Sequence, residues 1–135
     1  MKTVKTVGVV SIVVGIVLAL SGIVAYGLTG SQLAAAKVVV AEDAQWVAGT
    51  PVDDPLSAYA QQDIIDQHAL HSTEGKTYAE MDREDEKRPT AMNASFLRAS
   101  LFTSILAFGV SALVVAVGLV QVLTGVALIA VARKE

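Results

Sequence analysis

Two histidines are the residues of this sequence whose type and spacing best suit chemistry. His68 and His71 lie three positions apart, which places them on one face of a helix, and Asp63, Asp66 and Glu74 are nearby. Two imidazoles and a carboxylate form the ligand set of many non-haem iron sites. However, the spacing specifies no third ligand, and histidines in a last helical turn also stabilise the negative end of the helix. We therefore treat His68 and His71 as weak metal candidates, favour a structural role for them, and expect no catalytic residue and no cofactor.

The remaining charged residues indicate solvated surface rather than a site. The acidic run from Asp82 to Glu86 is interrupted by Arg83 and followed by Lys87 and Arg88, which favours an exposed charged turn over a cation site. The chain has no cysteine, which excludes thiolate nucleophiles, disulfides and cysteine metal sites. Twelve of the 13 acidic residues fall between Glu42 and Glu86. This acidic excess argues against nucleic acid as a partner.

The elements that must position these residues are two long apolar runs near the chain ends. Val7 to Leu28 contains no charged residue over about 22 positions, and Leu101 to Ala132 contains none over a helical length of roughly 45 Å. The hydrocarbon core of a bilayer is only ~30 Å thick, so both runs are predicted to span a membrane. A secretory signal peptide cleaved near Ala34 to Ala36 is an alternative for the first run. Its apolar stretch is longer than the roughly 7 to 15 residues of such signals, which favours an uncleaved anchor.

Basic residues at both chain ends predict the orientation of the two spans. Lys2 and Lys5 precede the first run, and Arg133 and Lys134 follow the second, which places both termini in the cytoplasm by the positive-inside rule. We expect an all-α membrane protein, an antiparallel two-helix transmembrane hairpin with a small, mostly helical extracytoplasmic cap. The expected segments are a cytoplasmic N-terminus (1–6), a first span (7–29, its helix extending as far as 36), an acidic cap (30–98), a second span (99–132, its helix starting as early as 90) and a cytoplasmic C-terminus (133–135).

Small residues recur every seven positions along both predicted spans. A seven-residue period corresponds to a gentle left-handed crossing, and small side chains let two helix backbones approach closely. The simplest partner of each line is the other line in the same chain, and pairing between chains is the alternative. Gln121 lies on the small-residue side and is expected to form an interhelical hydrogen bond, whereas Val115 lies outside the line. The predicted helix–helix interface is Gly8, Gly15, Gly22, Ser104, Ser111, Gly118, Gln121 and Gly125.

The segment between the spans carries helix-start signals. Asp54 followed by Pro55 predicts an N-cap and a helix that runs to about His71. Thr77 to Glu80 has the form of a capping box and predicts a second short helix through about Glu86, ended by Pro89. Trp46 is expected either to anchor a small packed cap or to lie at the membrane interface.

Three segments carry a resemblance to a known family. Pro51 to Pro55, Gly75 to Glu80 and especially Met92 to Phe102 resemble a family of small actinobacterial membrane proteins, over nearly the whole chain. Members of that family often carry the label of aromatic ring-opening dioxygenase. The resemblance implies a multi-pass protein of the cytoplasmic membrane of a bacterium. Two spans, an acidic cap and a lone histidine pair resemble neither a soluble dioxygenase subunit nor a catalytic chain with its iron ligands.

The functional expectation is a non-enzymatic small integral membrane protein. It would act as an accessory or interaction subunit of a larger membrane complex, with the lipid bilayer and other membrane protein subunits as partners and with homo-oligomerisation as a further option. One alternative is an iron-dependent aromatic ring-opening dioxygenase, as the family label suggests. Another is a homo-oligomeric envelope binding module.

Overall fold

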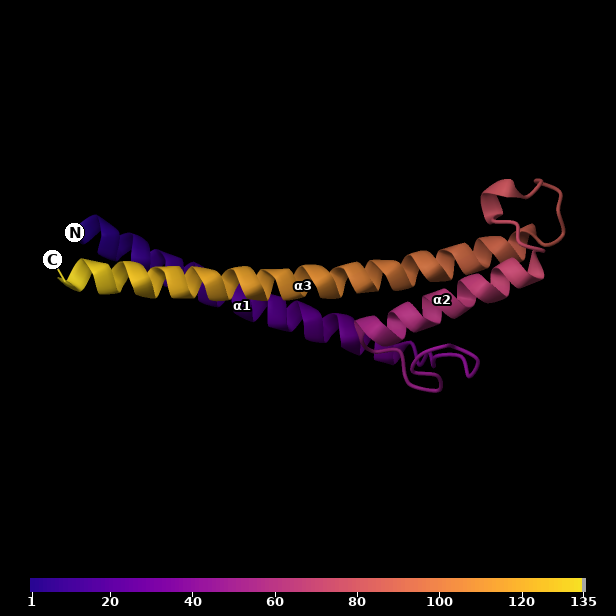
Figure 1. The fold of residues 1–135 in the computed structure, drawn as a ribbon, viewed down its shortest axis with the longest axis horizontal. Coiled ribbons are helices and arrows are strands. Elements are labelled where there is room, and N and C mark those ends of the chain that lie inside the picture. The colour runs from indigo at the N-terminus through magenta and orange to yellow at the C-terminus, as the bar shows by residue number, and fades with distance from the viewer. Residues whose placement is uncertain (135) are drawn as a thin grey trace. The chain divides into compact units, whose positions relative to one another are not determined.

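The structure is a computed structural model that describes residues 1–134, and it is all-helical over this range, as predicted. Its elements are α1 (Lys2–Ala35), α2 (Pro55–Ser72), the 3-10 turn η1 (Tyr78–Glu80) and α3 (Arg88–Lys134) (Figure 1). The described residues contain no β-strand, only a single antiparallel bridge between Val39 and Pro51. The chain forms two compact units. We call them the helix-pair unit (Met1–Leu28 with the chain from Ala107 onward) and the middle unit (Thr29–Leu106).

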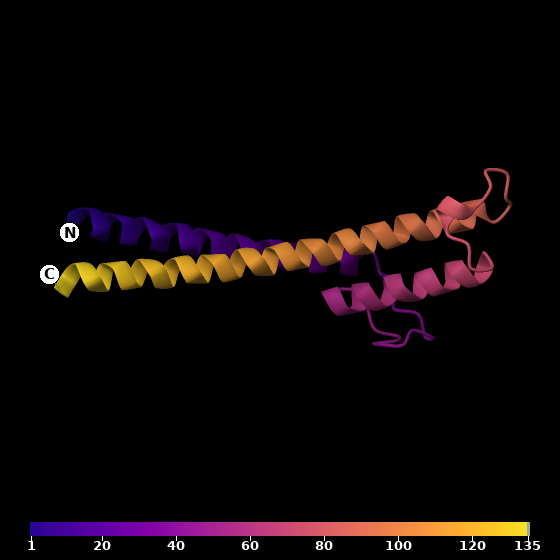
Figure 2. The same ribbon diagram turned by 45° about the horizontal axis from the view of Figure 1, so that its top comes forward.

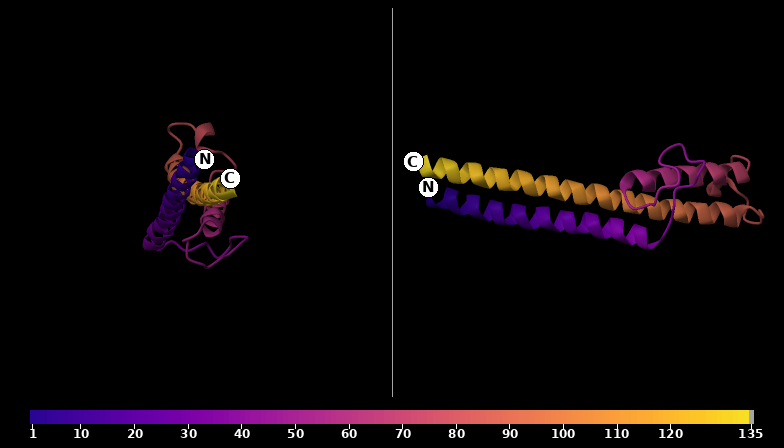
Figure 3. Two further views of the ribbon diagram at one scale, coloured as in Figure 1. Left: turned by 90° about the vertical axis from the view of Figure 1, so that its left-hand side faces the viewer. Right: turned by 90° about the horizontal axis from the view of Figure 1, so that it is seen from below.

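In the helix-pair unit, α1 and α3 lie side by side and run in opposite directions. Gly8 faces Gly125, Gly15 faces Gly118, and Gly22 faces Ser111, an order that only an antiparallel arrangement produces. The two chain termini accordingly lie at the same end of the pair in Figures 1 and 2, and the right-hand view of Figure 3 shows the two helices alongside each other. Both helices are long enough and apolar enough to cross a membrane.

Helix α2 of the middle unit begins where the sequence predicts. The Asp54 carboxylate accepts hydrogen bonds from the backbone N–H groups of Leu56 at 2.7 Å and Ser57 at 2.9 Å, and Pro55 occupies the first turn. The Asp54 N–H donates a 3.2 Å hydrogen bond to the Ser57 hydroxyl oxygen, and this second bond completes a capping box. After the helix ends at Ser72, Gly75 adopts a φ of 84°, a left-handed conformation that turns the chain away and that glycine adopts without strain.

A small apolar core holds the middle unit together. The loop before α2 folds back on itself through backbone hydrogen bonds from Val40 to the Thr50 carbonyl and from Val52 to the Val38 carbonyl, both 2.9 Å. These bonds bury Val40 and Val52, each 1% exposed. The buried core of the unit is Val40, Val52, Ala58, Ala60 and Leu101, with Leu33, Ala44, Ile65 and Ile105 packed against it.

Trp46 is not part of that core. Its side chain is 51% exposed and stacks on the Tyr59 ring, with ring centroids 6.1 Å apart. The anchoring role that we considered for Trp46 belongs instead to the two valines, because the folded loop turns Val40 and Val52 inward and leaves the indole on the surface.

The prediction of a second short helix through Glu86 is wrong. The capping box at Thr77 and Glu80 is present, but only the three-residue turn η1 follows it. Aspartates compete with helical hydrogen bonding here, since Asp85 Oδ1 accepts from the Lys87 N–H at 2.8 Å and Asp82 Oδ1 from the Glu84 N–H at 3.3 Å. Pro89 likewise does not end a helix but lies in the first turn of α3, where its missing N–H costs no helical hydrogen bond.

Candidate functional site

The contact between α1 and α3 is the candidate functional site of the helix-pair unit, and we call it the seam. Gly8, Gly15 and Gly22 are the buried residues of α1. A β-carbon added to Gly15 would lie 2.5 Å from the Gly118 carbonyl oxygen, and one added to Gly22 would lie 2.7 Å from the Ser111 carbonyl oxygen. Such distances are far below van der Waals contact. The backbones of the two helices therefore touch at these positions, and no larger residue fits without moving them apart.

A second line of residues on α3 completes the seam. Val115, Val122 and Ile129 are half-buried, and each lies within 2.9 Å of a β-carbon that would be added to Gly22, Gly15 or Gly8. Our expectation that Val115 lies outside the interface is wrong, because a helix presents two adjacent seven-residue lines to its neighbour and not one. Phe108 begins this second line, is 1% exposed, and contacts the Tyr26 ring with centroids 4.7 Å apart. The signal was present in the sequence as branched and aromatic residues seven apart.

Gln121 and Ser11 form the polar contact of the seam. The Ser11 hydroxyl lies 2.7 Å from Gln121 Oε1 and 2.8 Å from the Gln121 backbone carbonyl, so its proton is shared between two acceptors. Both side chains are half-buried. An interhelical hydrogen bond for Gln121 was the sequence-based expectation, and its donor is Ser11, which lies beside the glycine line of α1.

The two serines of the predicted interface both hydrogen-bond within α3. Ser104 belongs to the middle unit, is half-buried, and donates its hydroxyl hydrogen bond to the Ser100 carbonyl on its own helix. Ser111 is buried and also bonds within α3, to the Ala107 carbonyl at 2.7 Å. Gly27 and Gly109 have open space where a β-carbon would be, so not every glycine of these helices serves the seam.

The outward surface of the helix pair is apolar. Large hydrophobic side chains are 40% to 70% exposed on both helices. On α1 they include Val10, Val13, Leu20 and Ile23, and on α3 they include Leu113, Val120, Leu123 and Val131. A helix pair in water would bury its large apolar side chains and expose small or polar ones, and here the distribution is reversed.

The histidine pair does not come together with its neighbouring carboxylates. His68 Nε2 lies 2.6 Å from Asp43 Oδ2, a contact between α2 and the preceding loop, and this hydrogen bond lowers the pKa of the Asp43 carboxyl. His71 lies one turn further along, in the last turn of α2. Within residues 1–134, no three His, Cys, Asp or Glu side chains are grouped closely enough to hold a metal ion. The partner of His68 is thus Asp43, which the local spacing did not indicate.

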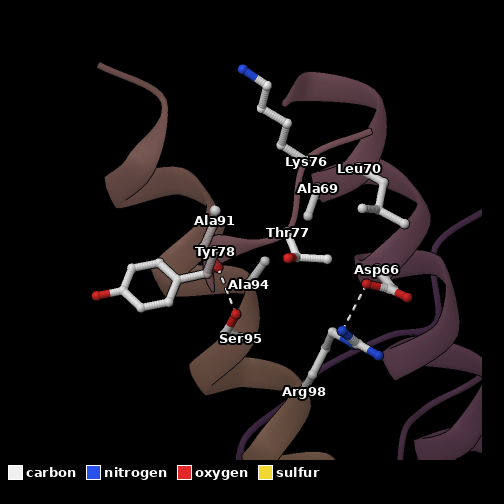
Figure 4. A pocket seen from close by; sticks show the side chains of 10 residues that line it. All are labelled: Asp66, Ala69, Leu70, Lys76, Thr77, Tyr78, Ala91, Ala94, Ser95 and Arg98. Carbon is white, nitrogen blue, oxygen red and sulfur yellow. Dashed lines mark hydrogen bonds and ion pairs between the residues drawn. The ribbon is translucent and has the colours of Figure 1, made fainter. Parts of the chain in front are cut away.

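An ion pair joins α2 to the first part of α3. Arg98 Nη1 lies 2.7 Å from Asp66 Oδ1, and Arg98 Nε lies 3.4 Å from Oε1 of the buried Gln62. Figure 4 shows Arg98 reaching from α3 toward Asp66 beside a cavity that Thr77, Tyr78 and Ser95 also line. The Arg98 guanidinium thus bonds within the middle unit.

The charged turn before α3 is exposed and internally paired. Lys87 Nζ lies 2.7 Å from Glu74 Oε1, and this contact lowers the pKa of Glu74 and raises that of Lys87. The pKa of Glu80 is lowered by hydrogen bonds from the backbone N–H and hydroxyl of Thr77. At neutral pH these groups therefore carry their full charges. They form a solvated surface, with no convergent set of side chains around a reacting group.

Comparison with protein-family models, with curated proteins and with solved structures finds no match. What the chain does must accordingly be inferred from its own residues and contacts.

Proposed function

We propose that this chain is a non-enzymatic integral membrane protein, in which α1 and α3 form a transmembrane hairpin and residues 30–98 form an acidic cap outside the cytoplasmic membrane. Its role is that of an accessory or interaction subunit of a larger membrane complex. The observation that carries the proposal is the distribution of side chains on the helix pair, with glycines in the seam and most of the large valine, isoleucine and leucine side chains facing outward.

The physical reason lies in what drives helix association in each solvent. In water, two helices associate by burying large apolar side chains, whereas in lipid those side chains gain nothing from burial. Close backbone contact across small residues then supplies the attraction through van der Waals packing. The seam shows such close backbone contact, with Gly8, Gly15 and Gly22 of α1 against Ser111, Gly118 and Gly125 of α3.

The orientation is supported by charge. Lys2 and Lys5 lie at one end of the helix pair together with Arg133, while acidic residues are concentrated in the middle unit. Basic residues flanking a span favour the cytoplasmic side. The acidic cap, residues 30–98, then lies on the opposite side, where its exposed carboxylates are solvated.

Exposed apolar side chains on the first half of α3 favour an interaction role over catalysis. Phe96, Leu97, Phe102 and Leu106 on the first half of α3 are each 46% to 67% exposed. Exposed apolar side chains of this size are typical of contact surfaces for other proteins or for lipid. Within the middle unit, the charged side chains of Asp66 and Arg98 are bonded to each other.

Cysteine accessibility in intact cells tests the topology, because the chain has no cysteine and single-cysteine variants need no background removal. We expect a membrane-impermeant maleimide to label Thr50→Cys and Glu84→Cys from outside, and to label Thr3→Cys only after the membrane is permeabilised. Labelling of Thr3→Cys in intact cells would show that the orientation is the opposite of the one proposed. Release of the protein from membranes at alkaline pH would refute membrane insertion itself.

Purification from native membranes under mild detergent tests the accessory role. We expect other membrane proteins to co-purify at fixed ratio and the assembly to migrate as one band in native electrophoresis. A purified chain that carries no other protein would contradict the role of an accessory subunit while leaving the hairpin intact.

A further inference from the structure

The Gln121 side chain carries a hydrogen-bond donor that residues 1–134 leave unused. A carboxamide has one oxygen acceptor with two lone pairs and one nitrogen with two N–H donors. Ser11 donates to Oε1, which leaves a second lone pair on that oxygen. In the described part of the chain, residues 1–134, no group accepts a hydrogen bond from Gln121 Nε2.

The unused nitrogen lies at the surface of the helix pair. No buried side-chain nitrogen or oxygen lacks a hydrogen-bond partner within the described residues. Gln121 itself is half-buried. Since Nε2 has no partner, it must be among the accessible atoms, and it therefore opens onto whatever surrounds the two helices.

The depth of Gln121 decides what those surroundings are. It precedes Arg133 by twelve residues, which corresponds to about 18 Å along a helix. Its partner Ser11 follows Lys5 by six residues, about 9 Å along a helix, so in a pair that spans a bilayer as proposed above Gln121 lies inside the ~30 Å hydrocarbon core. Neither water nor lipid headgroups supply an acceptor at that depth, and leaving an amide unpaired there is strongly unfavourable.

We propose that Gln121 joins two copies of this chain in the membrane. Each Nε2 donates to Oε1 of the other copy, so that two reciprocal hydrogen bonds use the spare donor and the spare lone pair on both sides. A carboxamide is self-complementary in this way, and a two-fold axis beside Gln121 brings the same surface of both copies together. This dimer rests on the proposed transmembrane hairpin, and the partner of each chain is a second copy of it.

The neighbours of Gln121 define where the copies meet. Val117 and Thr124 lie four residues before and three residues after it, and therefore flank it on the same side of α3. Both are exposed. Leu123 follows Gln121 by two positions and therefore points to the other side of the helix, where it is 69% exposed.

Oxidative crosslinking of single-cysteine variants in membranes tests the proposal. We expect Thr124→Cys and Val117→Cys to give covalent dimers and the matched control Leu123→Cys to give none. Equal crosslinking of all three variants, or crosslinking of Thr124→Cys only to a different protein, would overturn a dimer at Gln121.

Two side-chain variants separate the dimer from the stability of the hairpin. Gln121→Leu removes both the intrachain bond and the intermolecular pair, and we expect it to weaken dimerisation roughly 10-fold in analytical ultracentrifugation in detergent. Ser11→Ala removes only the intrachain donor and should leave dimerisation intact. A wild-type chain that stays in alkali-washed membranes but is monomeric would refute the dimer and spare the hairpin, whereas loss from the washed membranes would refute the hairpin first.

Discussion

A β-carbon added to Gly15 would lie 2.5 Å from the carbonyl oxygen of Gly118, so these two residues, far apart in sequence, bring the backbones of α1 and α3 into direct contact. The reverse relation holds as well, because a β-carbon on Gly118 would meet the Gly15 carbonyl oxygen at 2.6 Å. At both positions the nearest atom belongs to the backbone of the other helix, so no side-chain rotation relieves the contact. Relief requires the helices themselves to separate.

Enlarging Gly15 should therefore destabilise the helix pair. For Gly15→Leu or Gly118→Leu we expect a loss of at least about 1 to 3 kcal/mol, the usual cost of overpacking, since backbone atoms must move. Gly109→Leu is the matched control on α3, because a β-carbon there meets nothing within 4 Å. Unfolding in mixed detergent micelles measures the difference. Equal losses for Gly15→Leu and Gly109→Leu would show that the seam does not hold the helices together.

Removing the hydroxyl of Ser11 should have a smaller effect on the same pair. Interhelical hydrogen bonds in membranes contribute about 0.6 kcal/mol on average, so Ser11→Ala should cost about that much in the mixed-micelle assay. Ser21→Ala is the control, because its hydroxyl bonds to the Val17 carbonyl on its own helix. A loss at Ser21 as large as that at Ser11 would argue against the Ser11–Gln121 contact.

The N-cap of α2 should be the most sensitive polar residue at the start of that helix. Asp54→Ala removes the acceptor of two backbone N–H groups and should cost about 1 kcal/mol, measured by circular dichroism of the full chain during denaturation. Asp54→Ser should restore most of this stability, because serine is also a good N-cap. The adjacent Asp53→Ala change keeps the cap and should have less effect than Asp54→Ala.

The Glu74–Lys87 pair should be visible in a pH titration. Lys87 lowers the pKa of Glu74, so the pair contributes stability above the ordinary glutamate pKa, and that contribution is lost as pH falls through the lowered value. Lys87→Gln should raise the pKa of Glu74 toward its ordinary value, as followed by carboxyl carbon NMR. Lys76→Gln, which removes a weaker influence on Glu74, should shift that pKa less. The opposite ranking would place Glu74 beside Lys76 instead.

Features within one helix were predictable because their causes are local. The period of the α-helix places residues seven apart on one side, so the lines through Gly15 and Gly118 could be identified from spacing alone. The Asp54–Pro55 start likewise follows from side-chain chemistry within one turn. The wrong prediction of a helix through Glu86 has a local cause too, since the capping signal at Thr77 was outweighed by aspartates that bond their own backbone.

The sequence by itself determined that the chain is helical, that two helices are long and apolar enough to cross a membrane, and that each carries a line of small residues. Only the tertiary structure decided that Ser11 is the donor to Gln121, 110 positions away, and that Val115 lies within the seam. It also paired Arg98 with Asp66 and His68 with Asp43. Periodicity describes one helix at a time, whereas the register between helices is set by how their whole surfaces fit, which no local spacing contains.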